Sequence, residues 1–144
     1  MRVLFLFGPN LGALGSREPE RYGTRTLAEI MRDVEEHAAK LGLEISHRQS
    51  EAEAELVGWI ETAADDGFGA IVINAGALTH YSTALREAIA AAGIPAIEVH
   101  MTNVDAREEF RRRSELAPVC RVTIAGAGEG SYHLALEALP WITD

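Results

Sequence analysis

The chain has 144 residues, of which 47% are apolar and 24% charged, a composition typical of one soluble domain covering residues 1–144. Acidic residues outnumber basic ones by 22 to 13, and the resulting net charge of −9 argues against binding nucleic acid or an anionic membrane. The single cysteine, Cys120, excludes an intrachain disulfide and a cysteine-based zinc site.

The first element is the apolar run of residues 3–7, which ends at Gly8-Pro9. Continuous hydrophobicity is typical of a strand that is buried on both faces of a parallel sheet. The run is too short for a signal peptide or a membrane span, so we expect a cytoplasmic protein. Residues 8–24 then form a polar loop with Gly and Pro, and a loop of this length is often a binding loop.

Helices and strands alternate along the rest of the chain. Thr26 and Glu29 predict a capping box at the start of a helix that ends at Gly42. Ser50 and Glu53 predict a second capping box at the next helix. The other expected elements are strands at 43–48, 70–73, 95–99 and 119–125, a helix capped by Ser82 that runs to about residue 92, a short helix within 103–113 and a last helix at 129–139.

This alternation predicts a flavodoxin-like, doubly wound α/β domain with a five-stranded parallel sheet and helices on both faces. In such sheets, ligands bind beyond the carboxyl ends of the strands. The polar residues that follow the strands are therefore candidates for a site. They are Asn10, Arg17 and Tyr22 after the first strand, Asn74 and His80 after the third, and His100, Thr102 and Asn103 after the fourth.

Arg17 and Tyr22 share the first loop and could together provide a base. A tyrosine keeps its proton at neutral pH, but a nearby guanidinium stabilises the phenolate without competing for the proton. The alternative is a surface arginine beside a tyrosine that packs its ring on the domain.

Glu98 and His100 lie two apart on a strand, so their side chains share a face of the sheet. Such a carboxylate can fix the tautomer of the imidazole and hold it charged as a general acid. The alternative is a core histidine with satisfied polar atoms. In the same way, residues 74–80 offer either hydrogen bonds to a ligand or ordinary turn chemistry.

Two other functions on this fold are disfavoured. The glycines of residues 126–130 lack the dinucleotide-binding spacing and follow the last strand, which favours a turn over a phosphate loop. A signalling receiver would need acidic residues where Asn10 and Asn74 stand, and a lysine after the fifth strand, whereas the only lysine is Lys40. A flavin carrier would need a first loop rich in Ser and Thr.

Six segments carry recognisable motifs: GPNL at 8–11, GSREPERYG at 15–23, RQS at 48–50, INAGALTH at 73–80, IEVH at 97–100 and AREEFR at 106–111. In this order and spacing they resemble the type II 3-dehydroquinate dehydratase family over nearly the whole chain. The resemblance implies a dehydratase that converts 3-dehydroquinate to 3-dehydroshikimate and water, in the shikimate pathway or in quinate breakdown. It implies no metal or organic cofactor.

The resemblance also implies roles for the candidate residues. Tyr22, activated by Arg17, would remove the proton at C2 next to the ketone and give an enolate. Asn10 would position a water that stabilises the enolate oxygen. His100, oriented by Glu98, would protonate the departing C1 hydroxyl.

Substrate binding and assembly are implied in the same way. Asn74, the Thr102 hydroxyl and the backbone N–H groups of Met101 and Thr102 would hold the substrate carboxylate, while His80 and Arg111 would bind ring hydroxyls. Relatives form trimers, usually four to a dodecamer, in which a neighbouring carboxylate, here Glu87, approaches each site.

Several positions depart from the pattern of that family. Glu87 stands where Asp is common, Tyr81 where Thr is common, and Asp105 where His is common. None of them is a proposed proton-transfer residue. They leave open a relative that acts on an amino analogue of dehydroquinate.

Overall fold

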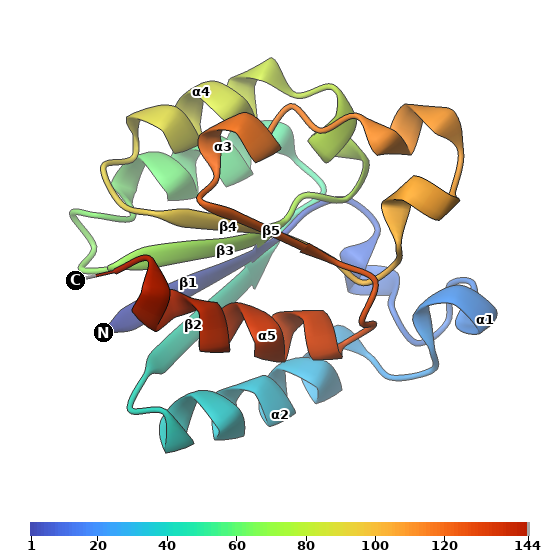
Figure 1. The fold of residues 1–144 in the computed structure, drawn as a ribbon, viewed down its shortest axis with the longest axis horizontal. Helices are drawn as coiled ribbons and strands as arrows, with labels where there is room; N and C mark the ends of the chain where they lie inside the picture. The colour runs from blue at the N-terminus through green and yellow to red at the C-terminus, as the bar shows by residue number, and fades with distance from the viewer. Residues whose placement is uncertain (144) are drawn as a thin grey trace.

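A computed structural model describes residues 1–143, so the last residue of the predicted domain lies outside the described part. Five parallel strands form one sheet in the order β2-β1-β3-β4-β5, which confirms the predicted fold (Figure 1). Helices α2 and α5 cover one face of the sheet, and α3 and α4 cover the other. The bounds are β1 (Arg2–Phe7), α2 (Leu27–Lys40), β2 (Glu44–Gln49), α3 (Glu53–Thr62), β3 (Ala70–Asn74), α4 (Thr83–Ala91), β4 (Ala96–His100), β5 (Val122–Ala125) and α5 (Gly130–Ala138).

Strand β1, which lies inside the sheet between β2 and β3, shows why helices cover both faces. Its residues alternate between faces, so Phe5 and Phe7 pack under α2 and α5 while Leu4 and Leu6 pack under α3 and α4. All four side chains are almost fully buried. The Phe7 ring meets Tyr132 of α5 edge-on, with centroids 5.5 Å apart. The hydrophobic effect therefore holds both helix layers to the same strand.

The predicted helix starts are correct in two cases and wrong in one. Thr26 and Glu29 form the expected capping box at α2, and the Ser82 hydroxyl accepts from the Leu85 N–H at the start of α4. The capping box predicted for Ser50 and Glu53 is absent, because α3 begins after Ala52. The Ser50 hydroxyl instead accepts from the Ala52 N–H at 2.9 Å, a local turn that competes with the cap.

Short turns replace some of the expected regular structure. The fifth strand begins only at Val122, since Ala117–Val119 form a 3-10 turn around Pro118, which has no N–H to donate to a strand. The short helix predicted within 103–113 is a pair of 3-10 turns, η3 (Val104–Ala106) and η4 (Glu109–Arg112). The first loop contains the 3-10 turn η1 (Leu11–Ala13) and one helical turn, α1 (Pro19–Tyr22).

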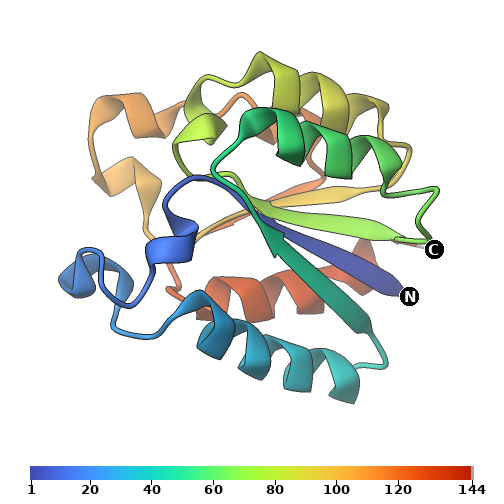
Figure 2. The ribbon, with the colours of Figure 1, turned by 180° about the vertical axis from the view of Figure 1, so that it is seen from behind.

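The sheet order places a crevice at the carboxyl ends of the strands. Strand β1 pairs with β2 on one side and β3 on the other, so the chain changes direction across the sheet between them. Helix α1 and the turns η3 and η4 gather at this end, and both termini lie at the other (Figures 1 and 2). Within residues 1–143, no helix has the length and apolar character to cross a membrane.

Candidate active site

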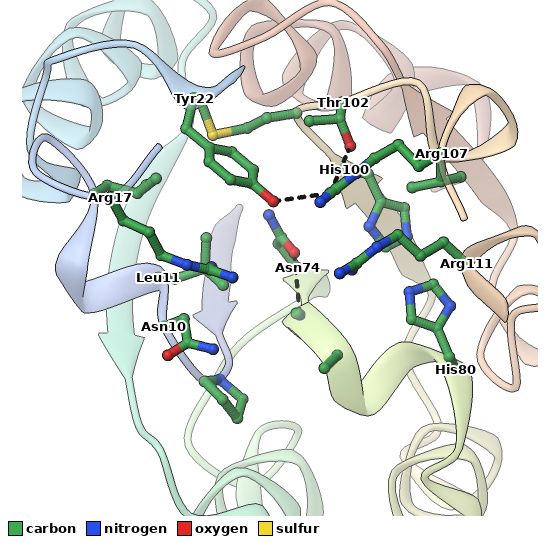
Figure 3. A pocket seen from close by; sticks show the side chains of 16 residues that line it. Asn10, Leu11, Arg17, Tyr22, Asn74, His80, His100, Thr102, Arg107 and Arg111 are labelled. Atoms are coloured by element: carbon green, nitrogen blue, oxygen red, sulfur yellow. Dashed lines mark hydrogen bonds between the residues drawn. The ribbon is translucent and has the colours of Figure 1, made fainter. Parts of the chain in front are cut away.

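A pocket lies at the carboxyl ends of β1, β3 and β4 and is closed on one side by the 102–111 segment (Figure 3). Most of the predicted site residues converge on it from four separate parts of the chain. Those that line the pocket are Asn10, Arg17, Tyr22, Asn74, His80, His100, Met101, Thr102 and Arg111. Glu98 lies behind the pocket wall against His100.

Two other predicted residues do not line this pocket. Asn103 instead caps the next turn, where its side-chain oxygen accepts from the Asp105 N–H at 3.3 Å. The other residue is Glu87. It lies exposed on α4 and does not line the cavity. Since the prediction assigned Glu87 to the site of a neighbouring subunit, its role stays a prediction.

The Tyr22 hydroxyl is held by a residue that sequence reasoning did not select. Arg107 donates from Nη1 to the Tyr22 oxygen at 2.8 Å and to the Thr102 hydroxyl at 3.4 Å. Arg17, the predicted partner, instead faces the ring, with its guanidinium carbon 5.5 Å from the ring centroid. Tyr22 therefore lies between two guanidinium groups, one at its oxygen and one over its ring.

The Arg107 side chain is only 8% exposed, although its backbone lies on a surface segment. Its Nε–H is buried without a hydrogen-bond partner, and its nearest carboxylate, that of Glu108, lies 3.9 Å away. A buried guanidinium with so little compensation favours an anion beside it. Arg107 belongs to the AREEFR motif, but nothing in that motif distinguishes an inward-pointing arginine from the surface arginines that follow.

Glu98 and His100 form the predicted pair. The imidazole Nε2 lies 2.6 Å from a carboxylate oxygen of Glu98, and both residues are buried at the end of β4. Because Nε2 is engaged by Glu98, Nδ1 is the ring nitrogen that remains for a ligand.

His80 faces His100 across the pocket, with ring centroids 6.4 Å apart and nearly parallel planes. Its Nδ1 donates to the Arg113 carbonyl at 2.7 Å, which leaves Nε2 free. Burial, opposed in part by that hydrogen bond, lowers the pKa of His80. His80 is therefore neutral at pH 7 and presents an acceptor nitrogen, which suits a substrate hydroxyl.

Asn74 connects the pocket to the core. Its side-chain amide donates to the Tyr132 hydroxyl at 3.0 Å, while its carbonyl oxygen accepts from the Gly76 N–H at 3.2 Å. Gly76 is required at this turn, since its φ is +60° and a Cβ there would lie 2.7 Å from the Pro9 carbonyl oxygen. These contacts fix the Asn74 amide at the pocket floor.

The charge of the pocket is opposite to that of the whole chain. Arg17, Arg107 and Arg111 line it, and none of the lining residues is acidic. A chain of net charge −9 thus concentrates cationic groups where a ligand would bind. This arrangement selects a small anion, such as a carboxylate. Among residues 1–143, no three His, Cys, Asp or Glu side chains are placed so as to hold a metal ion.

Comparisons with known proteins agree with this geometry. The family model "Dehydroquinase class II" matches residues 1–140. A 3-dehydroquinate dehydratase of Thermus thermophilus is 54% identical over 134 residues, covering 93% of this chain and 90% of that protein. One from Deinococcus radiodurans is 51% identical over 137 residues, covering 95% and 96%.

A solved structure leads to the same family. The crystal structure of a type II dehydroquinase from Butyrivibrio crossotus superposes with a TM-score of 0.94 at 40% identity, covering 97% of each chain. At this similarity in sequence and structure, the chain belongs to the class II dehydroquinase family.

Proposed function

We propose that this protein dehydrates 3-dehydroquinate to 3-dehydroshikimate. The observation that carries the proposal is the Tyr22 hydroxyl, bound by the buried Arg107 guanidinium in a pocket that also contains the Glu98–His100 pair. A base and an acid in a cationic pocket are what the elimination of water from a hydroxylated keto acid requires. Relatives that are about half identical carry the name of this activity.

In the first step, the Tyr22 phenolate takes the C2 proton of the substrate. The electrons of the C–H bond form a C2–C3 double bond, and the ketone becomes an enolate. Arg107 and Arg17 stabilise the phenolate that starts the step, since both guanidinium groups face Tyr22. Asn10, at the pocket edge, positions a water against the enolate oxygen.

In the second step, the enolate returns its electrons. The ketone forms again, a C1–C2 double bond appears, and the C1–O bond breaks. The leaving hydroxyl takes a proton from Nδ1 of His100 and departs as water, while Glu98 holds the ring through Nε2. The product is a conjugated enone.

Binding uses the remaining pocket residues. Asn74, the Thr102 hydroxyl and the backbone N–H groups of Met101 and Thr102 hold the carboxylate of the substrate. His80 accepts from a ring hydroxyl through Nε2, and Arg111 donates to another.

We also propose that the protein works in the cytoplasm as a trimer-based dodecamer, with Glu87 of a neighbouring subunit completing each site. The single cysteine is compatible with a reducing compartment. The exposed aromatic rings of Tyr81 and Phe110 beside the pocket support a subunit contact there.

The test is the turnover of 3-dehydroquinate, followed by the near-ultraviolet absorbance of the enone. Tyr22→Phe removes the base, so kcat should fall by about 100-fold or more. Tyr81→Phe, which alters an exposed tyrosine, is the matched control and should keep wild-type turnover. Wild-type turnover by Tyr22→Phe would rule out this base, and no enone from the unaltered protein would rule out the activity.

A further inference from the structure

The Glu98 carboxylate has a second partner besides His100. One of its oxygens lies 2.6 Å from His100 Nε2, and the other accepts a hydrogen bond of 2.6 Å from the Ser114 hydroxyl. Glu98 is 2% exposed, so these two contacts replace the water that the carboxylate would otherwise bind. Ser114 itself does not line the pocket.

The Ser114 hydroxyl can act only as a donor toward Glu98. Its oxygen accepts from two backbone N–H groups, those of Leu116 at 3.1 Å and Ala117 at 3.0 Å. Because a hydroxyl has two lone pairs and one hydrogen, both acceptor positions are then in use and the hydrogen points to Glu98.

The Glu98 carboxylate in turn fixes which ring nitrogen of His100 carries the hydrogen that points to it. A carboxylate that only accepts requires a hydrogen on His100 Nε2, so Nδ1 is the nitrogen that exchanges the catalytic proton. Ser114, Glu98 and His100 thus form one directed chain of hydrogen bonds that starts at the backbone of the η5 turn (Ala117–Val119).

The segment around Ser114 is itself anchored to the site. The Glu115 N–H donates to the Thr79 carbonyl at 2.8 Å, and the Arg113 carbonyl accepts from His80. The Ser114 hydroxyl is therefore held at a fixed place relative to both pocket histidines, as a residue that orients a catalytic group must be.

We propose that Ser114 is a positioning residue that holds the Glu98 carboxylate aligned with His100, so that His100 delivers its proton in the second step. The inference rests on the proposed dehydratase activity. Without the hydroxyl, one oxygen of a buried carboxylate loses its donor, and Glu98 can turn away from His100. That change weakens the acid but leaves Tyr22 and Arg107 in place.

The experiment compares Ser114→Ala with the unaltered protein. Loss of a hydrogen bond to a charged group should lower kcat about tenfold or more, with KM close to the wild-type value. In deuterated water, the enolate should still form normally but return to substrate more often. The ratio of deuterium exchange at C2 of the recovered substrate to turnover should therefore rise.

Two further variants separate positioning from folding. Ser114→Thr keeps the hydroxyl and should restore most of the turnover. Ser114→Cys keeps the size with a weak donor, so it should show the same loss of kcat if Ser114→Ala does not fold.

Ser82→Ala is the matched control, because the Ser82 hydroxyl also donates to a glutamate, Glu53, at 2.6 Å and accepts from a backbone N–H. It should cost stability without changing the ratio of exchange to turnover. An unchanged ratio in both Ser114→Ala and Ser114→Cys would overturn the inference while leaving the dehydratase intact. Absence of turnover by the unaltered protein would instead overturn the proposed activity.

Discussion

Two guanidinium groups face the Tyr22 ring, and their geometries differ. Arg107 reaches the phenol oxygen in line for a hydrogen bond, and this bond joins residues 85 positions apart in the chain. Arg17 lies over the ring and interacts with it electrostatically. A hydrogen bond strengthens as the oxygen becomes negative, so Arg107 stabilises the phenolate more directly.

Arg107→Lys should therefore reduce activity even though the charge is kept. A lysine carries a compact ammonium on a flexible stem, so it does not hold a donor at the Tyr22 oxygen with the fixed geometry of the buried, planar guanidinium. We expect kcat to fall about ten- to a hundredfold, the range for a lost hydrogen bond to a charged group. Steady-state kinetics with 3-dehydroquinate measure the change. Arg112→Lys, on the exposed side of the same segment, is the control, and an equal loss in both variants would contradict the assignment.

Residue-level prediction from sequence succeeded where the relevant neighbour is local. Glu98 and His100 could be paired because two-residue spacing on a strand puts side chains on one face. Arg107 and Ser114 could not be found in this way. Their partners, Tyr22 and Glu98, lie on other segments, and only the packed chain shows which polar side chains turn inward.

At the scale of elements, α2 and α5 are joined by a pair of histidines. His37 Nδ1 lies 2.8 Å from His133 Nδ1, and His37 Nε2 lies 2.8 Å from a Glu137 oxygen. One Nδ1 atom must donate and the other accept, so a hydrogen on both Nδ1 atoms would break this bond. One turn away, Arg25 bridges Asp33 of α2 and Glu129 at the start of α5.

This pair predicts a pH dependence of stability. Burial and then the nearby His37 lower the pKa of His133, although Glu129 and Asp33 oppose the shift. An unfolded histidine, with a pKa of about 6.5, then binds protons more readily than the folded one, so the free energy of unfolding falls as the pH drops below this value. The lowered pKa of His80 acts in the same direction.

Thermal unfolding between pH 7.5 and 5.5 tests this dependence. His133→Gln should lose less stability on acidification than the unaltered protein, because it removes one of the titrating groups. His47→Gln is the control, since His47 is exposed on β2 and pairs with Glu35 instead of another histidine. If the Tm of His133→Gln fell with pH as much as the Tm of the unaltered protein, the histidine pair would not contribute to the pH dependence of stability.

Helices were predictable where local signals act alone. Thr26 caps α2 with the glutamate three residues later, and no distant group competes. The same signal failed at Ser50 because Glu53 bonds to Ser82 of another helix at 2.6 Å. Such competition does not affect the spacing of apolar residues. For this reason, the predicted bounds of every strand and long helix agree with the structure to within a few residues.

For the molecule as a whole, the alternation of strands and helices was sufficient to predict a doubly wound sheet, and the sheet order then fixed the place of the pocket. The alternation of strands and helices does not predict which surface contacts another subunit. The exposed rings of Tyr81 and Phe110 flank His80 at the pocket rim, whereas Trp141, 88% exposed, lies in the 3-10 turn η6 (Leu139–Trp141) that follows α5 and does not line the pocket.

If the rim is a subunit contact, a charge placed there should weaken the assembly. Phe110→Asp would bury a carboxylate in an apolar contact, so the proposed dodecamer of 15.6 kDa chains should dissociate to smaller species. Light scattering on a sizing column measures the mass. Trp141→Asp should leave the mass unchanged, and an unaltered mass for Phe110→Asp would place the contact elsewhere.

The bond between Tyr22 and Arg107 has one more consequence. Tyr22 ends α1, a helical turn with no buried residue, while Arg107 comes from the segment on the far side of the pocket. The base therefore belongs to neither segment alone and is assembled only when the two meet. If the first loop moved away from the 102–111 segment, Tyr22 would keep Arg17 but lose the donor at its oxygen. The same contact would then close the pocket over the substrate and complete the base that removes its proton.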